Sequence, residues 1–94
     1  MNKILIIAHA PLAQALRECA LHVFPDCNQQ VLALDVLADA EPEDTFDAAC
    51  ALVQNLQGNL LVLTDLFGAT PSNVAQRLVQ RCAAVPHVEV AHLA

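Results

Sequence analysis

Residues Lys3–Ala8 read KILIIA, a nearly continuous run of isoleucine, leucine and alanine. A strand with one solvent-exposed face alternates apolar and polar residues, and this run does not. It therefore predicts a β-strand that is buried on both sides. Gln30–Val36 and Asn59–Thr64 (NLLVLT) have the same character. Strands of this kind belong to parallel sheets that are covered by helices. The sequence therefore predicts an α/β protein.

Helical patterns separate these strands. Leu12–Phe24 places apolar side chains at helical spacing, and Pro25 ends the segment. Pro42 begins a second helix at its first position, and Gly58 is expected to end that helix as a left-handed cap. The side chains expected to face the core are Leu12, Ala15, Leu16, Cys19, Ala20, Val23 and Phe24 on the first helix, and Phe46, Ala49, Cys50, Val53 and Leu56 on the second.

A third helix and a fourth strand complete the order. Thr70 is a good N-cap and Pro71 a good first helical residue. Val85–Leu93 is expected to form the last strand. The alternation β-α-β-α-β-α-β predicts a doubly wound, mostly parallel open sheet with helices on both faces. The inner face of the third helix should carry Val74, Ala75, Leu78, Val79 and Cys82.

The composition excludes several classes of protein. The 94 residues are 56% hydrophobic and 15% charged, which predicts one folded domain over residues 1–94 rather than disorder. A net charge of −6 and the lack of Trp and Tyr argue against nucleic-acid partners. No apolar run approaches the ~18 residues of a membrane span, and the N-terminal run is too short for a signal peptide. We therefore expect a cytoplasmic protein without direct membrane insertion.

Polar residues follow the first and third strands, in the loops where open α/β sheets bind ligands. His9 and Asp65 each stand directly at a strand end. If these strands are neighbours, the carboxylate can fix the tautomer of the histidine and leave its other ring nitrogen free to attack. Gly68, Thr70 and Ser72 then lead into a helix N-terminus, which favours an anion. Taken by itself, each loop favours a structural role, as a packed strand-end histidine or a well-capped helix.

Together, the two loops favour phosphoryl transfer through a phosphohistidine. Their sequences resemble the IIA component of the mannose family of the phosphoenolpyruvate-dependent sugar phosphotransferase system. Ile4–Ala10 (ILIIAHA) is similar to the strand and histidine motif of that family. Leu61–Asn73 (LVLTDLFGATPSN) is similar to its later aspartate, aromatic, glycine, hydroxyl, proline and asparagine pattern. Ala8 and Ala10 replace the threonine and glycine that flank the family histidine, and Ala69 replaces the second glycine of the later turn.

The resemblance implies that the phosphocarrier protein HPr phosphorylates His9 and that a IIB domain receives the phosphate. It implies a homodimer and no cofactor, and it implies that a further strand and helix of the family are missing from this sequence. The implied site has His9 and Asp65 as catalytic residues and Gly68, Ala69, Thr70 and Ser72 as phosphate-binding residues.

A regulatory role is the alternative function. Here the chain is an interaction module, and phosphorylation of His9 controls its binding to a partner protein without sugar transport. Leu66 and Phe67 beside the site would supply the partner-facing apolar surface. Transfer of the phosphate to a IIB domain would discriminate the two roles.

The remaining polar residues suggest no second site. Cys19, His22 and Cys27 lie close in sequence, but no fourth ligand completes a zinc site, so no metal is expected. The four cysteines are interpreted as free thiols, and His87, His92 and Arg17 as surface or edge residues. Only two glycines are present, which excludes the nucleotide-binding glycine motifs. The acidic run Asp39, Glu41, Glu43, Asp44 and Asp47 is interpreted as a solvated helix start, or as a face for a basic carrier protein.

Overall fold

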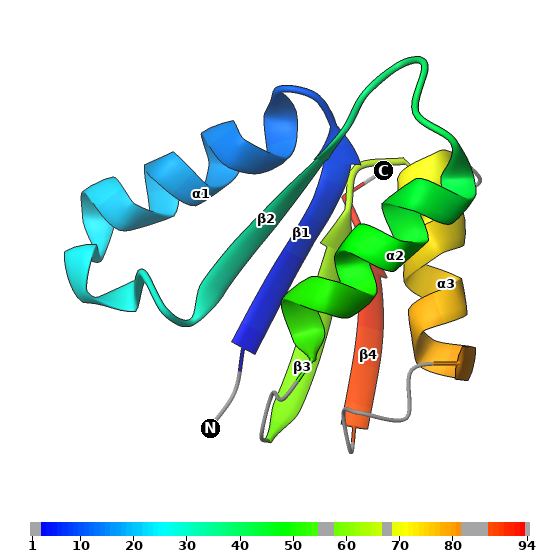
Figure 1. Ribbon diagram of the computed structural model, residues 1–94. Coiled ribbons are helices and arrows are strands. Elements are labelled where there is room, and N and C mark those ends of the chain that lie inside the picture. The colour runs from blue at the N-terminus through cyan, green and yellow to red at the C-terminus, as the bar shows by residue number, and fades with distance from the viewer. Residues whose placement is uncertain (1–2, 55–57, 67–68, 82–86, 94) are drawn as a thin grey trace.

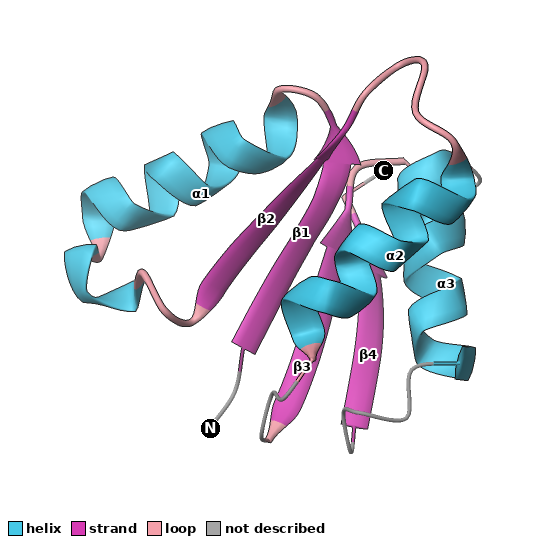
Figure 2. Cartoon of the chain, in the orientation of Figure 1, coloured by secondary structure: helices cyan, strands magenta, loops and turns pink. Residues whose placement is uncertain are grey.

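The computed structural model describes residues 3–54, 58–66, 69–81 and 87–93. All four strands run parallel, in the sheet order β2-β1-β3-β4 (Figure 1). The alternating order of strands and helices predicted from the sequence is therefore confirmed (Figure 2). The elements are β1 (Lys3–His9), α1 (Leu12–Val23), the 3-10 helix η1 (Pro25–Cys27), β2 (Val31–Val36), α2 (Pro42–Val53), β3 (Asn59–Thr64), α3 (Thr70–Arg81) and β4 (His87–His92).

Helices cover both faces of this sheet. α2 and α3 pack together on one face, and α1 lies on the other (Figure 1). Side chains of a strand alternate between faces, so β1 sends Leu5 and Ile7 toward α2 and α3, and Ile6 and Ala8 toward α1. The larger cluster of buried side chains lies on the α2/α3 face and comprises Leu5, Ile7, Val36, Ala49, Val53, Leu60, Val62, Val74, Ala75 and Leu78.

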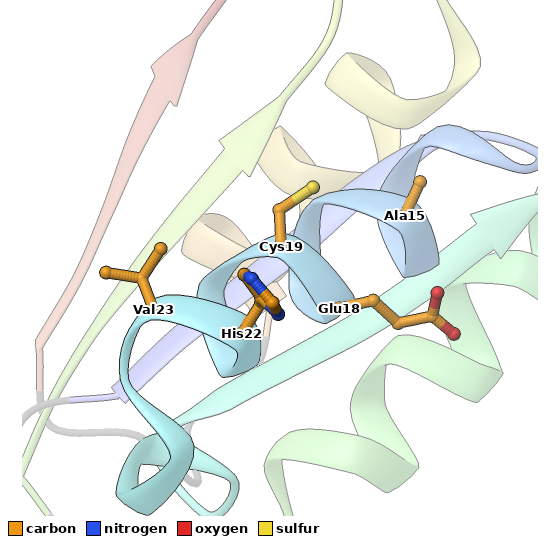
Figure 3. Close-up of a pocket in the computed structure, with 5 residues that line it drawn as sticks. All are labelled: Ala15, Glu18, Cys19, His22 and Val23. Atoms are coloured by element: carbon orange, nitrogen blue, oxygen red, sulfur yellow. The ribbon is translucent and has the colours of Figure 1, made fainter.

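The buried face of α1 differs from the prediction. Leu16 and Ala20 are partly buried as expected, but the one fully buried residue of the helix is Ala13. Of the three α-helices that the structure describes, α1 alone lies on its face, over β1 and β2, so its outer flank stays uncovered. A surface hollow along the helix is lined by Ala15, Glu18, Cys19, His22 and Val23 (Figure 3). The residues wrongly expected in the core are Leu12, Ala15, Cys19, Val23 and Phe24.

Polar contacts fix α1 on β2. The Arg17 guanidinium, expected at the surface, donates from Nε to the Val31 carbonyl at 2.8 Å and from Nη2 to the Asn28 carbonyl at 2.9 Å. At the other end of the helix, the Gln14 N–H donates to Oδ1 of Asp35 at 3.2 Å. A carboxylate at this helix N-terminus is favourable because it meets the positive end of the helix dipole.

Three element boundaries also differ from the prediction. α2 ends at Val53, so Gly58, with φ of 93°, is not its cap but the residue before β3. Thr70 is the first helical residue of α3 rather than its N-cap, and β4 begins at His87. Val79 is 45% exposed although it was expected in the core. Leu56, Cys82 and Pro86 lie outside the described residues.

Within the described ranges, no helix is both long and apolar enough to cross a membrane.

Candidate functional site

His9 and Asp65 meet at the carboxyl edge of the sheet. β1 and β3 are parallel neighbours, with Ile7 paired to Thr64. The sequence analysis required these two strands to be neighbours for His9 and Asp65 to meet, but could not establish it. His9 is the last residue of β1, and Asp65 directly follows β3. The chain turns to α1 on one face after β1 and to α3 on the other face after β3. The two residues thus occupy the point where strand order reverses, the usual ligand position of such sheets.

The carboxylate of Asp65 is held by three contacts. Its Oδ2 accepts the backbone N–H of His9 at 3.0 Å and lies 2.8 Å from the ring nitrogen Nδ1 of the same residue. Its Oδ1 accepts the N–H of Leu66 at 2.8 Å. Asp65 is 8% exposed, whereas the side chain of His9 is 45% exposed. A buried carboxylate therefore holds one edge of an imidazole whose remainder is accessible.

These contacts determine the protonation of the pair. Burial raises the pKa of the Asp65 carboxyl, because the charge loses hydration. Hydrogen bonds from the N–H and ring of His9 and from the N–H of Leu66 outweigh this effect and bring the pKa of Asp65 below its ordinary value. The ionised carboxylate can only accept, so Nδ1 of His9 is the donor. In the neutral imidazole this leaves Nε2 as the nitrogen with a free lone pair.

The N-terminus of α3 lies shortly after Asp65 in the chain. The first N–H groups of a helix have no acceptor within the helix. In α3 the Asn73 N–H donates to the Ala69 carbonyl at 3.0 Å, and Pro71 has no N–H. Among the residues that the structure describes, the N–H groups of Thr70 and Ser72 in the first turn have no acceptor. These donors and the helix dipole favour an anion.

The other predicted site residues have unequal exposure. Ala69 and Thr70 are partly exposed, while Ser72 is 1% exposed. Leu66 is 50% exposed beside Asp65. Phe67 and Gly68 lie outside the described residues.

β4 anchors the site in a way that the sequence did not reveal. Thr64, fully buried, shares a hydrogen bond between its Oγ1 and Nδ1 of His92. The Leu93 N–H donates to the Thr64 carbonyl at 2.8 Å. Both contacts fix the residue directly before Asp65. His92 and Thr64 are partners in the register of β3 and β4, which is set by pairing between distant segments. No local sequence pattern indicates this pairing, so His92 was interpreted as a surface or edge residue.

The cysteine and histidine residues of α1 do not form a metal site. In the described part of the chain, no three His, Cys, Asp or Glu side chains are grouped to hold a metal ion. Cys19 is exposed on α1, and the Sγ of Cys27 contacts the Ala20 carbonyl at 3.9 Å.

Comparison with known proteins places the chain in a family. The chain matches the family model EIIA-man, described as PTS system fructose IIA component, over residues 3–94. It resembles the crystal structure of phosphotransferase system component EIIA from Streptococcus agalactiae, with 26% identity and a TM-score of 0.81 over 100% of this chain and 70% of that one. It also resembles the PTS IIA protein associated with the fucose utilization operon from Streptococcus pneumoniae.

This second likeness has 22% identity and a TM-score of 0.77 over 98% of this chain and 68% of that one, and it supports the fold alone. No curated protein matches the chain. The family match covers nearly the whole sequence and includes both strand-end residues of the site. The chain therefore belongs to the family of PTS system fructose IIA components.

Proposed function

We propose that His9 accepts a phosphoryl group on Nε2 and passes it on within a mannose- or fructose-type sugar phosphotransferase system. The observation that carries this proposal is the double contact of Asp65 Oδ2 with the backbone N–H and the Nδ1 of His9. This double contact leaves Nε2, on the accessible side of the imidazole, as the ring nitrogen that acts as nucleophile. Membership of the family supports a phosphotransfer role in general.

The transfer needs no group beyond the two partners. The Nε2 lone pair of His9 attacks the phosphorus of the donor, and the bond from phosphorus to the donor atom breaks with its electron pair staying on the donor. Nδ1 keeps its proton, and the positive charge that develops on the ring is balanced by Asp65. In the second step an acceptor attacks the phosphorus, and the electron pair of the P–N bond returns to Nε2.

We assign the phosphoryl oxygens to the start of α3. The N–H groups of Thr70 and Ser72, with Gly68 and Ala69 before them, would donate to oxygens that carry negative charge throughout the transfer. The strand alternation supports this placement, because Ile7 points toward α2 and α3 and His9 follows it by two residues.

We further propose the physiological setting of the site. HPr is the donor and a IIB domain the acceptor, and the chain acts in the cytoplasm as one domain that forms a homodimer. The exposed apolar side chains of α1, such as Val23 at 64%, are compatible with burial in such an assembly.

Intact-protein mass spectrometry tests the proposal. The protein is incubated with phosphoenolpyruvate, enzyme I and HPr, and a His9→Ala variant is the control. One acid-labile phosphate that is absent in the variant is expected. A folded wild-type protein that takes up no phosphate would contradict the proposal. Subsequent loss of the phosphate to a IIB domain supports transport, whereas retention of it supports the regulatory role.

A further inference from the structure

The ends of β1, β3 and β4 form a row of paired residues directly behind the site. Strand register pairs Ile7 of β1 with Thr64 of β3, and it pairs the same Thr64 with His92 of β4. Asp65 directly follows Thr64 in the middle strand, and His9 lies two residues beyond Ile7 in β1. Contacts that fix Thr64 against β4 therefore also fix the point from which the Asp65 carboxylate extends.

The side chains of Thr64 and His92 point to the face of the sheet that α2 and α3 cover. Val62 and Val90 pack into the larger buried cluster on this face, and strand residues two apart point to the same side. Thr64 is fully buried, and its hydroxyl shares a hydrogen bond with Nδ1 of the partly buried His92. The last residues of β3 and β4 are thus linked by their side chains as well as by the strand pairing.

A backbone contact adds to this link. The Leu93 N–H donates to the Thr64 carbonyl at 2.8 Å. That carbonyl belongs to the same planar peptide unit as the N–H of Asp65, so the contact orients the peptide that leads into the aspartate. The end of β4 therefore holds both the side chain of Thr64 and the peptide group that follows it.

Asp65 has little tolerance for displacement. One oxygen, Oδ2, reaches the backbone N–H of His9 at 3.0 Å and its ring nitrogen Nδ1 at 2.8 Å. Hydrogen bonds weaken steeply outside a narrow range of distance and angle. A shift of the end of β3 would loosen the contact with Nδ1, and the imidazole could then carry its proton on Nε2, the nitrogen that must attack.

We propose that His92 is a positioning residue for phosphoryl transfer, which acts through the Thr64 hydroxyl to hold Asp65 where it keeps the Nε2 of His9 unprotonated. His92 acts in this role without contacting the phosphoryl group. Residues that orient a reacting side chain through a second residue commonly tune its reactivity. This inference rests on the proposed function of His9.

Two substitutions separate the hydrogen bond of His92 from the bulk of its side chain. His92→Asn keeps a donor and an acceptor bonded to Cγ, where Nδ1 stands, so it can bond the Thr64 hydroxyl whichever partner donates. His92→Leu fills the space and loses the hydrogen bond. His22→Leu is the matched control, because His22 is exposed on α1, which lies on the opposite face of the sheet (Figure 1).

The rate of His9 phosphorylation is measured with phosphoramidate, a small phosphoryl donor that makes no protein–protein contact. We expect His92→Leu to lower this rate about 5- to 50-fold, because a small misplacement of a supporting group has effects of this order. His92→Asn should retain the rate to within about twofold, and His22→Leu should leave it unchanged. A His92→Leu rate equal to that of wild type would overturn the inference.

Nitrogen NMR of His9 reports its orientation independently of the reaction. In the wild type, the neutral ring should carry its proton on Nδ1, which faces Asp65. His92→Leu should show a mixture of both tautomers, whereas His92→Asn should resemble the wild type. A His9 tautomer that is the same in wild type and in folded His92→Leu would contradict the inference, because the role of His92 would then be structural only.

A double variant separates positioning from stability. His92→Leu leaves the buried Thr64 hydroxyl without this partner and is expected to destabilise the fold. Thr64→Val/His92→Leu replaces both polar groups by apolar ones, so it should regain most of the lost stability. We expect its rate and its His9 tautomer to remain those of His92→Leu, because apolar contact lacks the directionality of a hydrogen bond. If the rate instead recovers together with the unfolding midpoint in urea, the inference is wrong.

Failure of this inference differs from failure of the proposed function. If phosphoramidate phosphorylates His9 in the wild type and His92→Leu changes neither rate nor tautomer, the function stands and the role of His92 is wrong. If the wild type accepts phosphate from neither phosphoramidate nor phosphorylated HPr, the proposed function fails, and a role of His92 in transfer fails with it.

Discussion

A single carboxylate oxygen, Oδ2 of Asp65, contacts His9 twice, through the backbone nitrogen at 3.0 Å and through ring Nδ1 at 2.8 Å. The backbone contact fixes where the strand end lies, and the ring contact fixes the tautomer and the orientation of the imidazole. The same atom therefore couples the position of the nucleophile to its chemical state. A shorter side chain at this position cannot make both contacts, and an uncharged one cannot balance a positive charge on the ring.

Replacing Asp65 by Asn tests this coupling. The amide keeps the size of the side chain but loses the charge that balances the imidazolium, and it can present its NH₂ group to Nδ1 and so favour the wrong tautomer. We expect the rate of His9 phosphorylation to fall about 10²- to 10⁴-fold, the range for other histidine–aspartate pairs. Rapid-quench phosphorylation assays measure the rate, with Asp26→Asn as the charge control. A loss of less than about threefold would show that Asp65 does not orient the histidine.

The lowered pKa of Asp65 predicts a pH dependence of stability. An aspartate in the unfolded chain titrates near pH ~3.9, and the folded value lies lower, so the folded chain binds fewer protons as the pH falls. The stabilisation by ionised Asp65 is therefore fully present above the unfolded pKa and is lost as the pH falls through the folded pKa. Urea unfolding between about pH 6 and pH 2 should show this loss in wild type and a weaker acid dependence in Asp65→Asn. Parallel profiles for the two proteins would exclude the effect.

The sequence predicts the strands of this fold better than its helix contacts. β1 and β3 could be predicted because their residues are apolar on both faces. This pattern is typical of strands in a parallel sheet that is covered on both sides. The pairing of His9 with Asp65 followed once these strands were assumed to be neighbours, and the sheet order confirms that assumption. The site thus depends on topology as well as on motif.

The errors on α1 and Gly58 have local physical causes. Helical periodicity shows which side chains share a face, but not how much of that face the sheet covers, so Cys19 and Val23 were wrongly placed in the core. A glycine with positive φ suits a helix cap and a strand entry equally, and Gly58 serves the latter. The contact of Thr64 with His92 depends on register between distant segments, which no local pattern encodes.

Thr64→Val is expected to destabilise the protein. Valine keeps the shape of the side chain but removes the buried hydroxyl that contacts Nδ1 of His92. We expect a loss of about 1–2 kcal/mol in the free energy of unfolding. Thr45→Val is the matched control, because the buried Thr45 hydroxyl only donates to the Glu41 carbonyl one helical turn earlier, and it should cost less than about 0.5 kcal/mol. Equal unfolding midpoints in urea for both variants would contradict a specific role for the Thr64 contact.

The exposure of Cys19 predicts fast thiol labelling of the native protein. Cys19 is exposed on α1, whereas Cys50 is partly buried against the core between the sheet and α2. Native labelling with a maleimide, followed by peptide mapping, should modify Cys19 well before Cys50. Cys19→Ser should change the free energy of unfolding by less than about 0.5 kcal/mol, because no buried volume is lost. Slow labelling of Cys19 in the isolated chain would show that its side of α1 is covered.

Arg77 joins α2 to α3 in two ways that mutation can separate. Its guanidinium lies 4.2 Å from the centroid of the Phe46 ring, and its Nη2 lies 2.9 Å from Oε1 of Glu43.

The Glu43 side chain is 74% exposed, so water screens the ion pair, and Glu43→Gln should cost less than about 0.5 kcal/mol. The Arg77 side chain is only 22% exposed and packs on the ring, so Arg77→Ala should cost about 1–2 kcal/mol. Arg77→Lys keeps the charge but loses the flat stacking surface, so it should fall between the two. Urea unfolding of the three variants measures this order, and a Glu43→Gln loss as large as that of Arg77→Ala would show that the ion pair dominates.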